Sequence, residues 1–282
     1  MTTDDHGTTE LTADRGYRDS IGKVEPYGVD HIPDAEKHGS AISQFYVWFA
    51  AGLSFPIMVL GFSASYFGLG LTGAMSAVLA GALVGSVLMG VLSRMGVHLG
   101  IPQQMQARGP LGFVGNIPPV AYINVFAGIG WAAVNVILGG RALQEFIDIP
   151  FWIAALGLVV VLMVIAVYGY NMIHMLQKVL TYVLVVLFVI TTVVLIAKGG
   201  ITLHGNRHAA GFIGAGGWIT LASWFLAFLV AWTPFASDYS RYLPDDRRTS
   251  IGAGIYTALG NFLTMAWLGI VGVILASSAT SS

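Results

Sequence analysis

Long, uninterrupted runs of apolar residues dominate the hydrophobic pattern of this chain. No Asp, Glu, Lys or Arg occurs between Lys37 and Arg94, and this stretch is long enough for two bilayer crossings. The whole pattern predicts seven transmembrane helices, at about 43 to 69, 73 to 93, 117 to 142, 151 to 170, 175 to 197, 216 to 236 and 251 to 276. The predicted fold class is therefore all-α, a polytopic membrane protein.

The composition agrees with lipid as the surroundings and argues against several function classes. Of the 282 residues 56% are hydrophobic and 10% charged, against roughly 25% charged in ordinary globular domains. The net charge of -1 lacks the basic excess of a protein that binds nucleic acid polymers. We find no cysteine, Ser-His-Asp set, paired intramembrane carboxylates or HExxH motif, so we expect no enzyme, no metal site and no cofactor. His204 and His208 have helical spacing but no carboxylate nearby, so they are not assigned to a metal.

The charged residues predict the orientation of the chain in the membrane. Residues 1 to 42 are rich in acids and lack the apolar core of a signal peptide, so they are expected to form a disordered cytosolic tail. With the N-terminus inside, eight Lys and Arg near the membrane are cytosolic and three are external. This bias favours a cytosolic N-terminus in the cell (plasma) membrane, with an external loop at 198 to 215.

Two of the predicted spans contain residues that interrupt helices. The first includes Gly52, Ser54 and Pro56 in WFAAGLSFPIMVLGF, and the sixth ends with Pro234 in VAWTPFASDY. Breaks within the bilayer expose backbone groups, so they persist where they line a cavity or an ion site. The separation of five spans fits an inverted repeat of five helices, although Pro and Gly are also common in ordinary membrane helices.

Small residues in the second span suit close packing of helices. Gly81 and Gly85 have the GxxxG spacing that lets two helix backbones approach each other. We interpret them as scaffold and assign no chemistry to them.

Polar and aromatic residues inside the spans are the candidates for ligand binding. Trp131 and Asn135 share one face of the third span, where an indole offers a stacking surface and an amide both a donor and an acceptor. Phe228 and Trp232 offer a second aromatic face beside the second break. Together they suit a small planar heterocycle, while the alternative is an interhelical hydrogen bond and ordinary packing. The remaining tryptophans near span ends are assigned to the interfacial belt: Trp48, Trp152, Trp218 and Trp267.

Three separated motifs carry a resemblance to a known family. The segments GIPQQMQARGPLGFVGN, GWAAVNVILGG and WTPFASDYSRYLP, with VEPYGVDHIPDAEKHGS leading into YVWFAAGLSF, resemble the purine and cytosine permease branch of nucleobase:cation symporter family 1. The resemblance covers roughly residues 20 to 280. It implies a leucine-transporter-like bundle of two inverted five-helix repeats, and a symporter that imports a nucleobase such as cytosine or a purine by alternating access.

The resemblance also implies roles for particular residues. Substrate would lie between the third and sixth helices beside the broken first, with contacts from Trp131, Asn135, Trp232, Phe228 and Gly52. A cation would be held by backbone carbonyls at the first break, represented by Ala51 and Ser54. The coupling ion is a proton or Na⁺, and no carboxylate at mid-span is available to carry a proton.

The chain departs from the family in length, since members usually have twelve spans. Residues 43 to 197 would form a complete first repeat and 216 to 282 the start of a second, helices six and seven. The sequence thus indicates truncation after the seventh span, or a fold completed by another polypeptide. Two alternatives stay open: transport of another ring-shaped nutrient (allantoin, hydantoin or a vitamin), and a truncated, non-transporting membrane scaffold.

Overall fold

The computed structural model describes residues 27–199, 201 and 212–280, and this part of the chain is built of helices. Most of the predicted tail and of the predicted external loop, including His204 and His208, lies outside the described residues. The helices follow in the order η1 Asp34–Glu36, α1 Ser43–Gly52, α2 Phe55–Phe62, η2 Ser63–Phe67, α3 Leu71–Leu99, α4 Gln103–Gln106, α5 Arg108–Gly115, α6 Ile117–Ala121, π-helix η3 Tyr122–Ala127, α7 Gly128–Gln144, α8 Phe151–Lys198, α9 Phe212–Val230, η5 Thr233–Phe235, η6 Ser240–Tyr242 and α10 Arg247–Thr280.

The predicted break in the first span is present. Helix α1 ends at Gly52, Leu53 and Ser54 leave the helical conformation, and α2 begins with Pro56 in its first turn. Proline suits this position because it has no N–H to leave unpaired at a helix start. The two halves meet at an angle of 59°, so the first span is a discontinuous helix.

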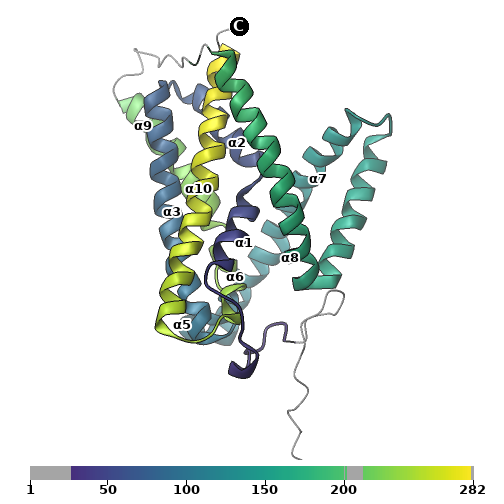
Figure 1. Ribbon diagram of the computed structural model, residues 1–282, viewed down its shortest axis with the longest axis vertical. Coiled ribbons are helices and arrows are strands. Elements are labelled where there is room, and N and C mark those ends of the chain that lie inside the picture. The colour runs from purple at the N-terminus through teal and green to yellow at the C-terminus, as the bar shows by residue number, and fades with distance from the viewer. Residues whose placement is uncertain (1–26, 200, 202–211, 281–282) are drawn as a thin grey trace, which may run out of the picture.

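Helices α1, α2, α3, α9 and α10 pack into one bundle (Figure 1), with α10 in contact with α1, α2 and α3. Its core contains fully buried residues from four of these helices: Ile57, Val78, Phe225 and Leu268. Gly81 and Gly85 lie where α3 crosses α9. A Cβ on Gly81 would collide with the backbone oxygen of Ala222, and one on Gly85 with the side chain of Leu229. The predicted role of these glycines in close packing is confirmed.

Helices α7 and α8 extend the bundle to one side. The assigned helix α8 is drawn in Figure 1 as two limbs that run in opposite directions, and the first limb lies beside α7. The second limb packs on the bundle, where Thr192 accepts a hydrogen bond from the indole N–H of Trp267 at 3.1 Å. The boundary between the predicted fourth and fifth spans therefore corresponds to a reversal of direction within α8.

The lengths of the described helices agree with a multi-pass membrane protein. By length and composition five can cross a membrane, or six if the bent pair from Ser43 to Phe67 counts as one span. The remaining predicted span, at 151 to 170, corresponds to a shorter apolar helix, Phe151–Ala166. Many apolar side chains of α7 and α8 are exposed, as expected for surfaces that meet lipid.

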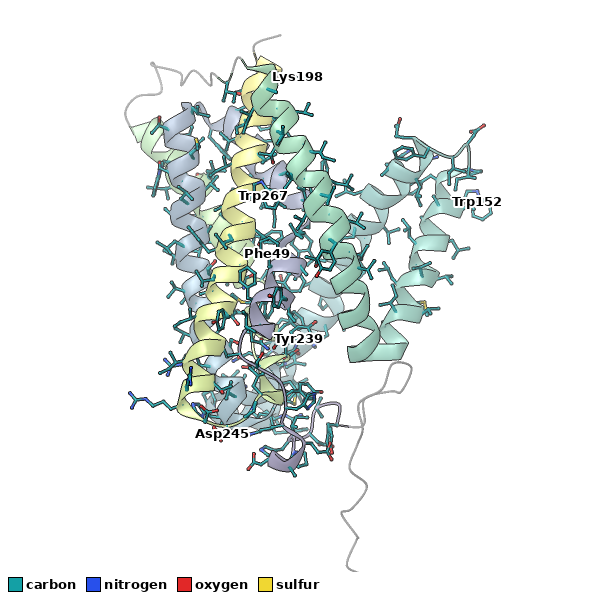
Figure 2. The ribbon with its side chains drawn as sticks, in the orientation of Figure 1. Phe49, Trp152, Lys198, Tyr239, Asp245 and Trp267 are labelled. Carbon is teal, nitrogen blue, oxygen red and sulfur yellow. The ribbon has the colours of Figure 1, made fainter. Side chains whose placement is uncertain are left out.

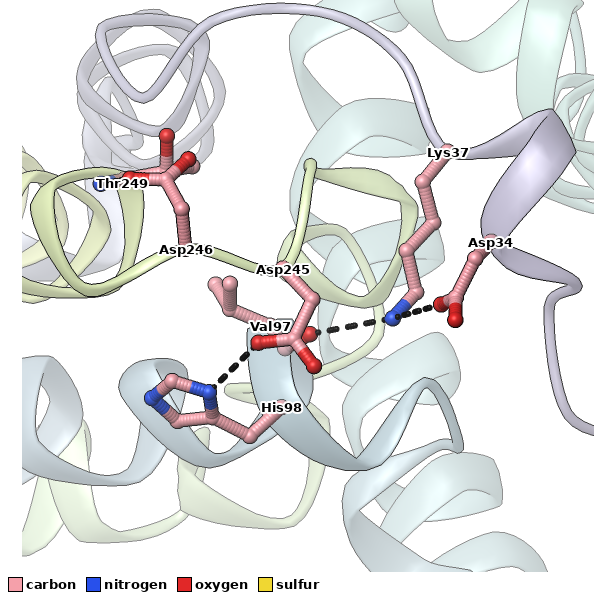
Figure 3. A network of polar contacts seen from close by, with 7 residues as sticks. All are labelled: Asp34, Lys37, Val97, His98, Asp245, Asp246 and Thr249. Atoms are coloured by element: carbon pink, nitrogen blue, oxygen red, sulfur yellow. Dashed lines mark hydrogen bonds and ion pairs between the residues drawn. The ribbon is translucent and has the colours of Figure 1, made fainter.

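The segment before α1 is bound across one end of the bundle. Lys37 pairs with Asp34 at 2.9 Å and donates to the Val97 carbonyl at 3.3 Å, while His98 meets Asp245 at 2.7 Å (Figure 3). The Lys37 ammonium lowers the pKa of Asp34 below its ordinary value, by hydrogen bonding and by charge. These contacts tie the N-terminal segment and the loop before α10 to the end of α3.

Candidate functional site

The predicted break in the sixth span is also present. Helix α9 ends at Val230, Trp232 N–H bonds back to the Leu229 carbonyl at 3.0 Å, and a short 3₁₀ turn holds Pro234. The hydroxyl of Thr233 donates to the Val230 carbonyl at 2.7 Å and so satisfies one acceptor that the helix end leaves open. Trp232 therefore lies within this break, two residues after the end of α9.

The two breaks face each other across a small internal space, which we call the central gap. It is lined by residues from α1, α9, the second break and α10: Trp48, Ala51, Gly52, Phe228, Leu229, Trp232, Asn261 and Met265. The indoles of Trp48 and Trp232 meet edge to face with ring centroids 6.4 Å apart. The gap has a volume of about 10 Å³, which is room for roughly one water molecule. A heterocycle can enter only when these walls separate.

The structure brings together some of the predicted substrate residues and not others. Gly52, Phe228 and Trp232 line the central gap. Trp131 lies outside it, 41% exposed, but its ring packs edge to face on Phe228 at 5.5 Å. Asn135 is exposed, and its amide nitrogen donates to the Trp131 carbonyl at 2.8 Å, within its own helix.

The predicted cation residues lie at the first break. Ala51 lines the central gap, whereas Ser54 is half-buried and does not. The carbonyls of Ala50 and Gly52 accept hydrogen bonds from Leu53 and Ser54 at 3.1 and 2.8 Å. In the described residues no group of three or more His, Cys, Asp or Glu could hold a metal ion, so any cation here would be bound by backbone and hydroxyl oxygens.

Sequence reasoning missed four residues of the central gap: the apolar Leu229 and Met265, and Trp48 and Asn261, which carry polar groups. Trp48 was assigned to the interfacial belt, but it is 1% exposed and lies against Trp232 and Tyr239. The belt assignment of Trp48 is therefore wrong. Its position four residues before Gly52 places both on one helix face, a signal that was available. Asn261 is a buried polar residue within the seventh span, a rare residue type at such a position.

A second, larger space opens on the side of the N-terminal segment, and we call it the N-side cavity. It measures about 440 Å³ and is lined by Gly28, Val29, Pro102, Gln104, Met105, Val120, Asn124, Phe235, Asp238, Tyr239, Arg241 and Tyr242. Aromatic side chains connect it to the central gap, because Phe235 packs on Trp232 at 6.0 Å and Tyr239 on Trp48 at 5.9 Å. Figure 2 places Tyr239 between Phe49 and Asp245 along the length of the bundle.

Buried hydroxyls connect the second break to α3 and α10. Thr257 donates to the Ser93 hydroxyl at 2.9 Å, and Ser240 donates to the Ser93 carbonyl at 2.6 Å. Ser237 bonds the Leu92 carbonyl at 3.0 Å and the Gln103 amide oxygen at 2.6 Å. The segment after Trp232 is thus fixed by polar contacts rather than by a continuous helix.

Comparison with known proteins defines the class of this fold and site. The family described as permease for cytosine/purines, uracil, thiamine, allantoin matches residues 31–282. The chain therefore belongs to this family, whose members are transporters rather than enzymes. The resemblance drawn from the sequence motifs is confirmed.

Curated relatives agree with this assignment. YxlA of Bacillus subtilis, named as a candidate purine-cytosine permease, is 30% identical over 91% of this chain and 55% of its own length. Purine-cytosine permease FCY21 of Saccharomyces cerevisiae is 26% identical over 85% of this chain and 46% of its own. The vitamin B6 transporter TPN1 of the same yeast is 24% identical over 93% and 46%. The chain spans about half the length of the curated relatives it matches.

A solved structure confirms the fold. Mhp1, a transporter of the nucleobase-cation-symport-1 family, in a closed conformation with bromovinylhydantoin bound, superimposes with a TM-score of 0.75. The match covers 90% of this chain and 57% of that chain at 19% identity. The predicted all-α transporter fold is thereby confirmed.

Proposed function

We propose that the protein is a secondary transporter that imports a nucleobase such as cytosine or a purine across the cell membrane, with its N-terminus in the cytosol. The observation that carries the proposal is that two broken helices meet at the central gap, where Phe228 and Trp232 present aromatic faces. Discontinuous helices facing each other at a repeat interface are where transporters of this architecture bind substrate. Purine-cytosine permeases among the relatives favour a nucleobase as the cargo.

Alternating access fits the two spaces on either side of Trp232 and Trp48. The central gap is nearly closed, whereas the N-side cavity has ample room for a heterocycle. In the proposed cycle, separation of these two indoles joins the spaces and releases substrate toward the cytosol. Trp131 would enter the site by moving past Phe228, with Asn135 beside it on the same helix face.

The transport is coupled to a proton or to Na⁺ in this proposal. In the last turn of α1 the Ala50 and Gly52 carbonyls accept N–H groups from Leu53 and Ser54, whereas the Ala51 carbonyl faces a break in place of a continuing helical turn. The C-terminal end of a helix also carries partial negative charge. A cation at Ala51 and Ser54 would therefore be favoured, and Na⁺-dependent substrate binding is the measurement that identifies it.

The substrate assignment is tested by two substitutions in the purified full-length protein. Trp131→Ala should weaken binding of the transported heterocycle about tenfold or more, because stacking on an aromatic ring contributes about 1–3 kcal/mol per base. Asn135→Ala should weaken it about tenfold, because it loses a hydrogen bond of about 1.4 kcal/mol. Trp152→Ala, on an exposed residue of α8 far from the gap (Figure 2), is the matched control and should leave affinity unchanged. Unchanged binding in both Trp131→Ala and Asn135→Ala would refute this site assignment.

A second candidate is another ring-shaped nutrient, favoured by the vitamin B6 transporter among the relatives. A panel of cytosine, hypoxanthine, allantoin, hydantoin and pyridoxine separates the two by affinity. A non-transporting scaffold would bind none of them. The proposed repeats are residues 43 to 197 and 216 to 282.

A further inference from the structure

The indole N–H of Trp48 is buried without a hydrogen-bond partner in the part of the chain that the structure describes. The side chain is 1% exposed and lines the central gap. Burying an unpaired donor of this kind destabilises the fold, so its retention calls for an explanation. By contrast, the indoles of Trp218 and Trp267 donate to Ser76 and Thr192 at 2.9 and 3.1 Å.

An acceptor lines the same gap from α10, which packs against α1. Asn261 is 4% exposed, and its amide nitrogen donates to the Thr257 carbonyl at 3.0 Å. That bond uses the nitrogen within α10 and leaves the amide oxygen as the polar atom that can serve the gap. Trp48 on α1 and Asn261 on α10 thus supply one donor and one acceptor to a space walled by Phe228 and Trp232.

We propose that Trp48 and Asn261 read the polar edge of the substrate, while the aromatic side chains hold its faces. This inference rests on the proposed function and specifies the ligand chemistry. The ligand has an acceptor that takes the Trp48 N–H beside a donor that reaches the Asn261 oxygen. Neighbouring C=O and N–H groups of a lactam, or the ring N and N–H of an amidine, have this pattern.

The apolar wall of the gap favours recognition of the ligand through its hydrogen-bonding edge, and not through its shape alone. Leu229 and Met265 complete its wall with apolar atoms, so an unmatched polar group of the ligand would find no other partner there. A site that hydrogen-bonds its ligand rejects analogues lacking the bonding group, because the buried groups of the protein are then left unpaired. The pair therefore gives selectivity among heterocycles of equal size.

The test compares variants and ligand analogues in the purified full-length protein. Trp48→Phe keeps an aromatic ring and removes the donor, and Asn261→Leu removes the acceptor. Each should weaken binding of the preferred heterocycle about tenfold, the effect of one lost hydrogen bond of about 1.4 kcal/mol. A deaza analogue with C–H in place of the edge N–H should bind the wild type about tenfold more weakly than the parent heterocycle does. Asn261→Leu should bind the analogue and the parent heterocycle equally well.

Two control variants separate this role from general packing. Trp267→Phe removes an indole N–H that is already paired with Thr192, and it should leave the ligand preference unchanged. Gln44→Met removes a second buried, unpartnered atom, the amide oxygen one turn before Trp48, that does not line the gap. If Gln44→Met lowers affinity as much as Trp48→Phe does, the Gln44 amide oxygen and the Trp48 N–H both act by supporting the fold, and the inference is wrong.

The outcomes distinguish this inference from the proposed function. Normal binding by Trp48→Phe and Asn261→Leu, with loss of binding by Trp131→Ala, would refute the edge reading alone. Failure of the wild type to bind any heterocycle of the panel would refute both. If a variant does not fold, the analogue series on the wild type still decides, because equal affinity for the parent and every edge-modified analogue overturns the inference.

Discussion

At the scale of single residues, Asp246 determines how α10 begins. Its carboxylate accepts the Thr249 N–H at 2.9 Å, and its carbonyl accepts the Ser250 N–H at 2.9 Å. This is the arrangement of a helix N-cap. Hydrogen bonds from the side chain and backbone of Thr249 lower the pKa of Asp246. Helix α10 carries Asn261 and Met265 of the central gap, so a cap that stabilises its first turn also helps to hold these two residues in place.

The lowered pKa of Asp246 predicts a pH dependence of stability. A carboxyl group whose folded pKa is depressed stabilises the fold above its unfolded pKa, near 4, and this contribution is lost as the pH falls through the folded value. Asp246→Asn keeps a cap but has no charge, so its unfolding temperature at pH 7 should fall slightly. The deficit relative to the wild type should shrink below about pH 4.

Asp246→Ala provides the comparison, because it removes the cap at every pH. It should lower the unfolding temperature more than Asp246→Asn does, and the deficit should persist in acid. Thermal unfolding followed by circular dichroism between pH 3 and pH 8 measures both. A constant difference between Asp246→Asn and the wild type over this range would contradict the assignment of the pH effect to this carboxylate.

The residue scale also shows what the sequence could and could not predict. Gly52, Phe228 and Trp232 were predicted at the site from their place beside helix breaks, and the structure brings them together. Trp48 was misplaced because hydropathy does not tell which aromatic residues near a span end turn inward. That direction is decided by contact with Trp232 and Tyr239, which lie far away in the sequence.

At the scale of helices, the contact between α3 and α9 depends on Gly81. Its Cα lies so near the Ala222 backbone that any added Cβ must push the helices apart. Gly81→Ala should therefore destabilise the fold by about 1–3 kcal/mol, as overpacking of a close contact does. Because α9 carries Phe228 and Trp232, substrate affinity should fall as well.

Gly73→Ala in the same helix is the matched control, since its Cβ would meet only Leu69 at an ordinary 3.8 Å. It should be neutral or slightly stabilising because alanine is the better helix former. Unfolding temperature and heterocycle binding, measured side by side for both variants, check the prediction. Equal stability of Gly81→Ala and Gly73→Ala would show that α3 and α9 are packed less closely at Gly81 than in the structure.

Helix-scale features were predictable where local chemistry dictates them. Proline and glycine locate the break between α1 and α2, and small residues at four-residue spacing predict a close helix contact on α3, although not that α9 is its partner. The hydroxyl contacts among Ser93, Ser240 and Thr257 were not predicted. These three residues are far apart in the sequence, and nothing in the local pattern around any one of them predicts its partners.

At the scale of the whole molecule, the two ends of the bundle differ. The N-side cavity and the segment from Gly28 to Lys37 lie at one end, and Lys198 lies at the other (Figure 2). Lys and Arg residues are more frequent on the side of the N-terminus, which favours the cytosol for that end. In the proposed direction of transport, the larger cavity is then the exit for imported substrate.

This orientation is testable because the chain has no cysteine, so each introduced thiol is unique within it. Val29→Cys is on an exposed residue at the rim of the N-side cavity, and Lys198→Cys is on an exposed residue at the opposite end. In intact cells a membrane-impermeant maleimide should label Lys198→Cys. It should label Val29→Cys only after the membrane is permeabilised. The reverse labelling pattern would place the N-terminus outside the cell. The N-side cavity would then open to the exterior, and the protein would either export its heterocycle through this cavity or import it by that route.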